Sequence, residues 1–342
     1  MMAPPPSLDI VPPLINSANP WATTVDDLQA LYDCAATGAV TTRTSLIQGF
    51  PHDPARHQYL LYDAATHKAE QDQSSLTGLE NASLNNLGYS PHNLEAYIGF
   101  IKTIAGRLPS GAPAKKGFII SVTGSPEDVV GCYKLISSAQ GDVPFPLAME
   151  INLSCPNIPG KPPPAYNGAA LLGYLTALKE VASDSSLTRI PYGLKTPPYV
   201  QSTEYAALIG ALEDSASSDP SGVCPVSFIT ATNTLGSCIV VSPPDGSSSV
   251  QAVLPGTGIG GMAGAPLHPL ALGNVLTIRK MLDDKKEALG HIPIIGIGGV
   301  LDAAGYRRMK GVGAAVVGVG TGLGIRGVSV FTEIEKDLGS TW

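Results

Sequence analysis

Two segments near the end of the chain, IPIIGIGG (292–299) and AAVVGVGTG (314–322), each join an apolar run to a glycine-rich end. Both runs have the length and β-branched character of a parallel strand that is buried on both faces. A helical pattern at 303–310 lies between them. The pair therefore predicts a strand–helix–strand unit with a turn of glycines after each strand.

The same alternation continues through most of the chain. Apolar runs predict further strands, so that the full set is 39–42, 117–122, 148–153, 192–195, 226–230, 292–297 and 314–319. Helical periodicity predicts helices at 24–35, 91–107, 126–138, 168–182, 202–213, 269–285 and 303–310. Without a clear linker between the units, residues 1–342 are predicted to form one (β/α)₈ barrel domain. A doubly wound open sheet is the alternative.

Two stretches fit neither kind of element. Residues 48–87 are polar and loop-like, and residues 238–265 are rich in Ser, Pro and Gly with a hairpin-like pattern of valines. We expect both stretches to cover the mouth of the barrel.

Composition narrows the class of protein. A chain of 342 residues with 44% hydrophobic and 14% charged residues can bury a large core. A formal charge of −7 and no Lys/Arg-rich run argue against nucleic acid or an anionic membrane as partner, so a small molecule is expected. Five scattered cysteines without a C-x-x-C suggest neither disulfides nor a metal site. The proline-rich residues 1–14 have no apolar run of signal or membrane length, which predicts a cytoplasmic location.

The segment NLSCPN (152–157) sets Cys155 between Asn152 and Asn157 just after a predicted strand. A thiol can remove a proton from carbon when an electron sink is close, and Asn offers a donor and an acceptor without adding charge. The alternative is that Cys155 is a small buried hydrophobe in an ordinary turn. The placement after a strand end favours a catalytic site.

The glycine clusters predict a phosphate site. The last two strand loops of a barrel commonly bind phosphate through backbone N–H groups, and glycine permits the close approach. A third cluster, GTGIGG (256–261), precedes a predicted helix and is expected to close over the same ligand. Each cluster taken singly is equally explained by turn glycines. Together, in a barrel, they favour FMN, with its ring above Cys155.

Other polar residues follow predicted strands at the same rim. Lys195 ends the strand 192–195, where a cation would balance charge on a reduced flavin ring. A lysine that only reaches to solvent is the alternative. Asn233 and Thr234 follow the strand 226–230 and add an amide and a hydroxyl.

These motifs resemble the dihydroorotate dehydrogenase family, specifically its soluble class 1A type that uses fumarate as electron acceptor. The matching segments are NLSCPN (152–157), GLKTPPY (193–199), TNTLG (232–236), GIGG (258–261) and the two final glycine loops. The likeness is continuous from about residue 145 to 327. A cysteine at 155, where the membrane-bound class carries serine, points to class 1.

The resemblance implies FMN-dependent oxidation of dihydroorotate in pyrimidine biosynthesis by a homodimer, with fumarate or another soluble acceptor. It implies that Cys155 is the general base and Lys195 a catalytic residue beside the flavin. The substrate-binding residues would be Arg43, Asn81, Asn152, Asn157, Asn233 and Thr234. The cofactor-binding residues would be Ser17, Ala18, Arg43, Asn152, Lys195, Gly261, Gly298, Gly299, Gly320 and Thr321.

The first half of the chain departs from the family pattern. Arg43 stands where the family has a lysine, and the family's Gly-Asn-Pro-x-Pro-Arg stretch is absent from 48–58. The loop 81–88 is a residue shorter and lacks the internal Gly and Pro. These changes favour, as an alternative, a related FMN-dependent oxidoreductase acting on another activated C–C bond. A non-catalytic flavin-binding protein is a third hypothesis, although it would need neither Cys155 nor Lys195.

Overall fold

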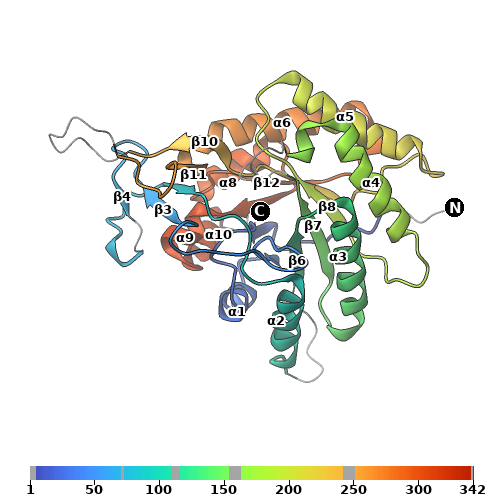
Figure 1. The fold of residues 1–342 in the computed structure, drawn as a ribbon, viewed down its shortest axis with the longest axis horizontal. Coiled ribbons are helices and arrows are strands. Elements are labelled where there is room, and N and C mark those ends of the chain that lie inside the picture. Colours follow the sequence, from blue (N-terminus) through green and yellow to red (C-terminus); the bar gives the residue numbers. More distant parts are fainter. Residues whose placement is uncertain are drawn as a thin grey trace.

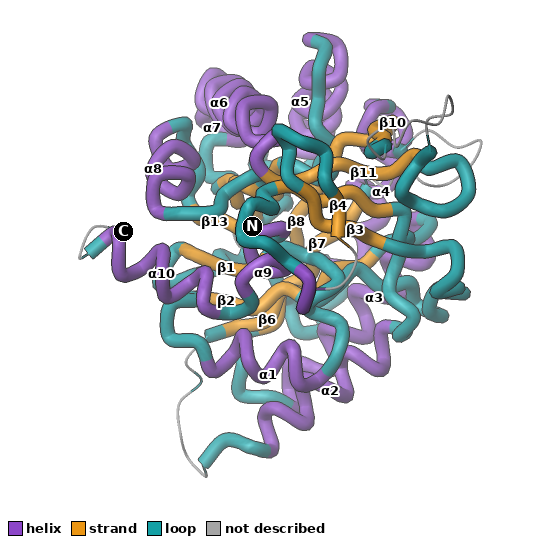
Figure 2. Tube along the Cα trace, turned by 90° about the vertical axis from the view of Figure 1, so that its left-hand side faces the viewer, coloured by secondary structure: helices purple, strands orange, loops and turns teal. Residues whose placement is uncertain are grey.

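The computed structural model describes residues 5–70, 73–109, 114, 116–153, 163–241, 251–339 and 342. Eight parallel strands form a closed barrel in the order β1-β13-β12-β9-β8-β7-β6-β2 (Figures 1 and 2). The strands are β1 Leu14–Asn16, β2 Ala39–Thr41, β6 Gly117–Val122, β7 Leu147–Asn152, β8 Tyr192–Lys195, β9 Phe228–Ala231, β12 Ile294–Ile297 and β13 Val316–Val319. The predicted barrel is confirmed, and the open-sheet alternative is wrong because β1 pairs with both β13 and β2.

Helices surround the barrel, as Figure 2 shows. All seven predicted helices are present, as α1 Val25–Asp33, α2 Leu94–Gly106, α3 Pro126–Ala139, α4 Gly168–Ala182, α5 Ser202–Ser217, α6 His268–Asp284 and α8 Ala303–Gly311. Three further helices were not predicted, namely α7 Lys286–Leu289, α9 Thr321–Arg326 and α10 Ser329–Leu338. Single 3₁₀ turns occupy Gln73–Ser75, Gln140–Asp142, Pro164–Tyr166 and Ala265–Leu267. Across the described ranges, no helix has both the length and the apolar character needed to cross a membrane.

A second, antiparallel sheet lies at one end of the barrel, on the left in Figure 1. Its order is β10-β11-β5-β3-β4, formed by β10 Leu235–Ile239, β11 Ile259–Gly264, β5 Ala82–Asn85, β3 Tyr59–Tyr62 and β4 Ala69–Glu70. Ser83 of β5 contacts Thr321, which follows the carboxyl end of β13. The sheet therefore packs at the end of the barrel where the strands finish.

The expectation that residues 48–87 are loop-like is wrong, because they contain β3, β4 and β5. These strands are only two to four residues long. β3 pairs with β5, and β5 also pairs with β11, which lies more than 170 residues away in the sequence. The hairpin pattern in 238–265 is confirmed by the antiparallel pairing of β10 with β11 and of Val241 with Ala252.

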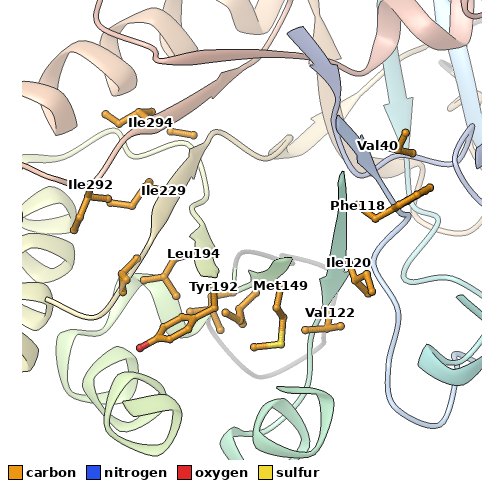
Figure 3. Packing of buried hydrophobic residues seen from close by; sticks show 14 of the residues in the cluster. Val40, Phe118, Ile120, Val122, Met149, Tyr192, Leu194, Ile229, Ile292 and Ile294 are labelled. Atoms are coloured by element: carbon orange, nitrogen blue, oxygen red, sulfur yellow. The ribbon is translucent and has the colours of Figure 1, made fainter. Parts of the chain in front are cut away.

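Strand alternation divides the core into an inner and an outer part. In β6, Phe118, Ile120 and Val122 belong to the outer cluster, which includes residues of the surrounding helices (Figure 3). Ile119 belongs to the cluster inside the barrel. Ile10 belongs to the inner cluster and lies on the chain just before β1. The inner positions nearer the strand ends are polar, and they form the site described next.

Candidate active site

A cavity lies at the carboxyl ends of the barrel strands and comprises about 1040 Å³, including its opening to solvent. The ends of β1, β2, β7, β8, β9, β12 and β13, or the loops that follow them, line it. Because parallel strands all finish at the same end of a barrel, residues far apart in sequence meet there. The structure brings to this lining the predicted site residues Ser17, Ala18, Arg43, Asn152, Lys195, Asn233, Thr234, Gly298, Gly299, Gly320 and Thr321.

Two predicted site residues do not line the cavity. Asn81 precedes β5, and its Oδ1 atom accepts a hydrogen bond from the backbone N–H of Ala64 at 3.1 Å, so it supports a turn of the second sheet. Gly261 lies in β11, where a Cβ atom would come within 2.3 Å of the Thr234 Oγ1 atom. Gly261 thus makes room for a lining residue. Cys155 and Asn157 fall outside the described residues.

Two lining residues of the second sheet were not predicted from the sequence. Ser83 and Asn85 line the cavity, while their neighbours Ala82 and Leu84 are buried on the other face of β5. The Ser83 hydroxyl lies 2.8 Å from the Thr321 hydroxyl, and the Asn85 Nδ2 atom donates to the Gly261 carbonyl at 3.3 Å. The alternating pattern A-S-L-N was the available signal.

A chain of hydrogen bonds runs along the cavity floor. Asn233 donates from Nδ2 to Oδ1 of Asn152 at 3.1 Å, and Asn152 donates from Nδ2 to Thr44 Oγ1 at 3.2 Å. Thr44 Oγ1 lies 2.9 Å from Ser121 Oγ, which donates to Glu150 Oε1 at 2.9 Å. Since the single hydroxyl proton of Ser121 goes to Glu150, Thr44 is the donor to Ser121. The two amides are thereby held in defined orientations.

Lys195 is buried at the end of β8, with only 4% of its side chain exposed. Its Nζ atom lies 4.0 Å from Oε1 of Glu150, whose side chain is 2% exposed. The interpretation of Lys195 as a lysine that reaches to solvent is wrong. A buried ammonium needs an opposite charge, and Glu150 supplies it.

Arg43 places a second cation in the cavity wall and is 8% exposed. Its Nη2 atom donates to the Tyr89 carbonyl at 3.1 Å, and its Nη1 atom contacts Thr23 Oγ1 at 3.5 Å. Burial lowers the pKa of Arg43 from its ordinary value. Within the described part of the chain Arg43 forms no salt bridge, so the cavity has a positive charge available for an anion.

The glycine-rich strand ends form one wall. Gly299 has φ +68°, and a Cβ atom there would lie 2.5 Å from the carbonyl oxygen of Gly264. A Cβ atom on Gly320 would lie 2.9 Å from Ser17 Oγ. Nearby, the buried Thr232 hydroxyl lines the cavity and has no hydrogen-bond partner among the described residues. This wall therefore combines glycine backbone that a ligand can approach closely with a polar atom that a ligand would satisfy.

The mouth of the barrel gathers a buried lysine, oriented amides and the glycine-rich ends of the last two strands, which is the arrangement of an enzyme of the barrel class with its active site at the carboxyl ends of the strands. The family model for dihydroorotate dehydrogenase matches residues 65–341. The chain therefore belongs to the dihydroorotate dehydrogenase family, which comprises flavin-dependent oxidoreductases that act on a CH–CH bond.

Individual relatives are similar over most of the chain. A probable dihydroorotate dehydrogenase A (fumarate) of Streptococcus pneumoniae is 27% identical over 332 residues, covering 95% of this chain and 88% of the relative. A dihydroorotate dehydrogenase (fumarate) of Trypanosoma cruzi is 28% identical over 257 residues, covering 75% and 72%. The crystal structure of DHODH from Eimeria tenella in complex with ferulenol superposes with a TM-score of 0.67 at 16% identity, covering 95% and 80%, which supports the fold.

Proposed function

We propose that this protein oxidises dihydroorotate to orotate, with FMN in the main cavity and fumarate as electron acceptor. The observation that supports this most is the convergence of Lys195, Asn152 and Asn233 with the glycine-rich ends of β12 and β13 at one cavity. All of these residues lie in the part of the chain that the family model matches. The named relatives are fumarate-type dihydroorotate dehydrogenases.

The cofactor fits the wall formed by the last two strands. Gly298, Gly299, Gly320 and Thr321 would bind its phosphate through backbone and hydroxyl groups, as barrel loops seven and eight do in other enzymes. When bound, FMN supplies a ring that accepts a hydride. Lys195 would hold positive charge beside that ring, and Ser17 and Ala18 would lie along the cofactor.

The oriented amides would bind the substrate ring. Asn152 and Asn233 form a hydrogen-bonded pair, and an amide side chain can offer both a donor and an acceptor to a cyclic amide substrate. Thr234 and Asn157 would add further contacts. Arg43 would pair with the substrate carboxylate, since a guanidinium is a bidentate donor.

Cys155 would act as the base. Its thiolate would take the proton from one ring carbon while the neighbouring carbon loses a hydride, so that a carbon–carbon double bond forms between them. The proton leaves with the thiol, and the two electrons leave with the hydride. This role is proposed from the resemblance of NLSCPN to the family motif.

The resemblance also predicts a cytoplasmic homodimer that uses a soluble acceptor. Light scattering on the purified protein would measure the mass in solution directly. A monomer at micromolar concentration would contradict the predicted dimer.

The proposed activity is tested by adding dihydroorotate to the FMN-loaded protein without oxygen while following the visible absorbance of the flavin. Rapid bleaching that fumarate reverses would establish both substrates. A flavin that dithionite reduces but dihydroorotate does not would contradict the assignment. That result would favour a related enzyme for another activated C–C bond. Two features favour this second candidate: the arginine at position 43 and the placement of Asn81 outside the cavity.

A further inference from the structure

The turn at Gly298 and Gly299 is held from behind by a histidine. His268 is the first residue of α6 and is 7% exposed. Its Nδ1 atom lies 2.6 Å from the carbonyl oxygen of Gly298, and a Cβ atom on Gly299 would lie 2.6 Å from the His268 Cβ atom. Among the described residues, both glycines line the main cavity and His268 does not. The histidine therefore supports the turn from the side away from a ligand.

A second hydrogen bond fixes which nitrogen of His268 carries the proton. Arg308 of α8 donates from Nε to the Nε2 atom of His268 at 3.0 Å. A guanidinium nitrogen can only donate, so Nε2 is the unprotonated acceptor of a neutral ring. The ring proton is then on Nδ1, which donates it to the Gly298 carbonyl. Arg308 thus sets the tautomer with which His268 holds the turn.

The hydrogen bond to the Gly298 carbonyl also orients the next backbone N–H group. The peptide bond between Gly298 and Gly299 is trans, and in a trans peptide unit the carbonyl and the following N–H point in opposite directions. The N–H of Gly299 is therefore directed away from His268. Across the described ranges this N–H donates to no other group. It is left to donate to a ligand in the main cavity.

We propose that His268 and Arg308 are positioning residues for the phosphate of the cofactor, an inference that rests on the placement of FMN in the proposed function. His268 holds the Gly298 carbonyl, and Arg308 holds the tautomer of His268. The Gly299 N–H is thereby fixed in the direction of the phosphate oxygens. Neither side chain touches the cofactor. The pair determines how strongly the site prefers a flavin with a phosphate over a flavin without one.

Equilibrium titration of the flavin-free full chain with FMN and with riboflavin separates this role from a structural one. The two flavins share the ring and differ in the phosphate, so the ratio of the riboflavin Kd to the FMN Kd reports the phosphate interaction. His268→Leu should lower this ratio about tenfold or more, because a hydrogen bond to a charged group is among the stronger ones. The riboflavin Kd itself should stay within about twofold of the wild-type value.

Three further variants test the roles of the proton and of the charge. His268→Asn keeps an N–H donor for the Gly298 carbonyl without a choice of tautomer, so the ratio should stay within about threefold of wild type. Arg308→Met should lower the ratio about threefold or more in the wild-type background and leave it unchanged in the His268→Asn background. Arg307→Met removes the same charge from the neighbouring position of α8, where the guanidinium donates to the Asp337 carbonyl at 3.0 Å. It should not change the ratio.

Three results would overturn the proposal. Equal weakening of FMN and riboflavin binding in His268→Leu would show a structural role. An unchanged ratio in Arg308→Met would remove control of the tautomer, and Arg308 is exposed, so this variant gives an answer even where His268→Leu does not fold. A fall of the ratio in Arg307→Met as large as in Arg308→Met would show that only the charge of α8 matters.

The titration contains neither dihydroorotate nor fumarate. A failure of the proposed dihydroorotate activity would therefore leave its result interpretable. Wild-type protein that bound riboflavin as tightly as FMN would instead contradict the placement of the phosphate, and the roles of His268 and Arg308 with it.

Discussion

The Nζ atom of Lys195 lies 4.0 Å from Oε1 of Glu150, inside the barrel and beneath the main cavity. The two residues come from neighbouring parallel strands, where Glu150 is paired in register with Gly193 and Asn152 with Lys195. Lys195 lies two residues beyond Gly193 and therefore on the same face of the sheet as Glu150, so the carboxylate and the ammonium meet across the strand pair. The positive charge of Lys195, which we assign to cofactor binding, is thus balanced by the Glu150 carboxylate.

Replacing Glu150 with Gln should destabilise the protein by about 3–5 kcal/mol, the usual result of leaving one buried charge unpaired. The amide oxygen of the introduced glutamine can still accept a hydrogen bond from the Ser121 hydroxyl, so the loss of stability reports the removal of the negative charge alone. Urea unfolding measures it. The double variant Glu150→Gln with Lys195→Met is the control. Its loss of unfolding free energy should be smaller than the sum of the losses in the two single variants. Additive losses would show that the two side chains are not coupled.

Gly299→Ala should reduce both stability and FMN affinity. A Cβ atom there would lie 2.5 Å from the Gly264 carbonyl oxygen and 2.6 Å from the His268 Cβ atom, in a backbone with φ +68°. Gly327 is a matched control, with φ +62° and open space within 4 Å of where its Cβ atom would lie. Gly327→Ala should cost about 1–3 kcal/mol, because φ +62° with ψ −159° is a backbone conformation that is essentially restricted to glycine, and it should retain FMN. If Gly299→Ala and Gly327→Ala changed the rate of FMN release equally, Gly299 would have no specific role in holding the cofactor.

Cys155→Ala should keep FMN bound while flavin reduction by dihydroorotate slows by roughly 10²–10⁴-fold, the usual contribution of a general base. Stopped-flow absorbance under anaerobic conditions gives the rate of the reductive step alone. Cys155→Ser is the control, because a hydroxyl of nearly the same size can still take part in proton transfer. An unchanged rate in the alanine variant would remove Cys155 from the mechanism.

Stability should fall at alkaline pH, in part because of Cys224. Burial raises the pKa of this thiol to about 12, above the ordinary value of about 8.5 that it has in the unfolded chain. Its contribution to stability is therefore complete below about pH 8.5 and is lost as the pH rises toward 12, at up to ~1.4 kcal/mol per pH unit. Cys224→Ala should flatten the slope of unfolding free energy between about pH 9 and 11. Identical slopes in Cys224→Ala and the wild type would show that Cys224 does not contribute to the pH dependence of stability.

Local sequence patterns determined the barrel and much of its site. Seven strands and seven helices follow from apolar periodicity, which depends only on neighbours in sequence. Since parallel strands finish at one end of a barrel, the residues after them, such as Asn152, Lys195 and Gly299, could be assigned to one site before their distances were known.

Tertiary structure alone decided the features that depend on distant partners. The strands β3 and β5 are too short to be recognised until β11 pairs with β5. This pairing turns Ser83 and Asn85 toward the cavity, whereas Asn81 precedes the strand and accepts a hydrogen bond from Ala64. The partner of Lys195 was likewise hidden, because Glu150 is the one charged residue of β7 and no neighbour in sequence shows what it faces. The sequence carries the period of each element, whereas the contacts between elements form only when the barrel closes. Those contacts decide which charges and polar groups meet in the cavity.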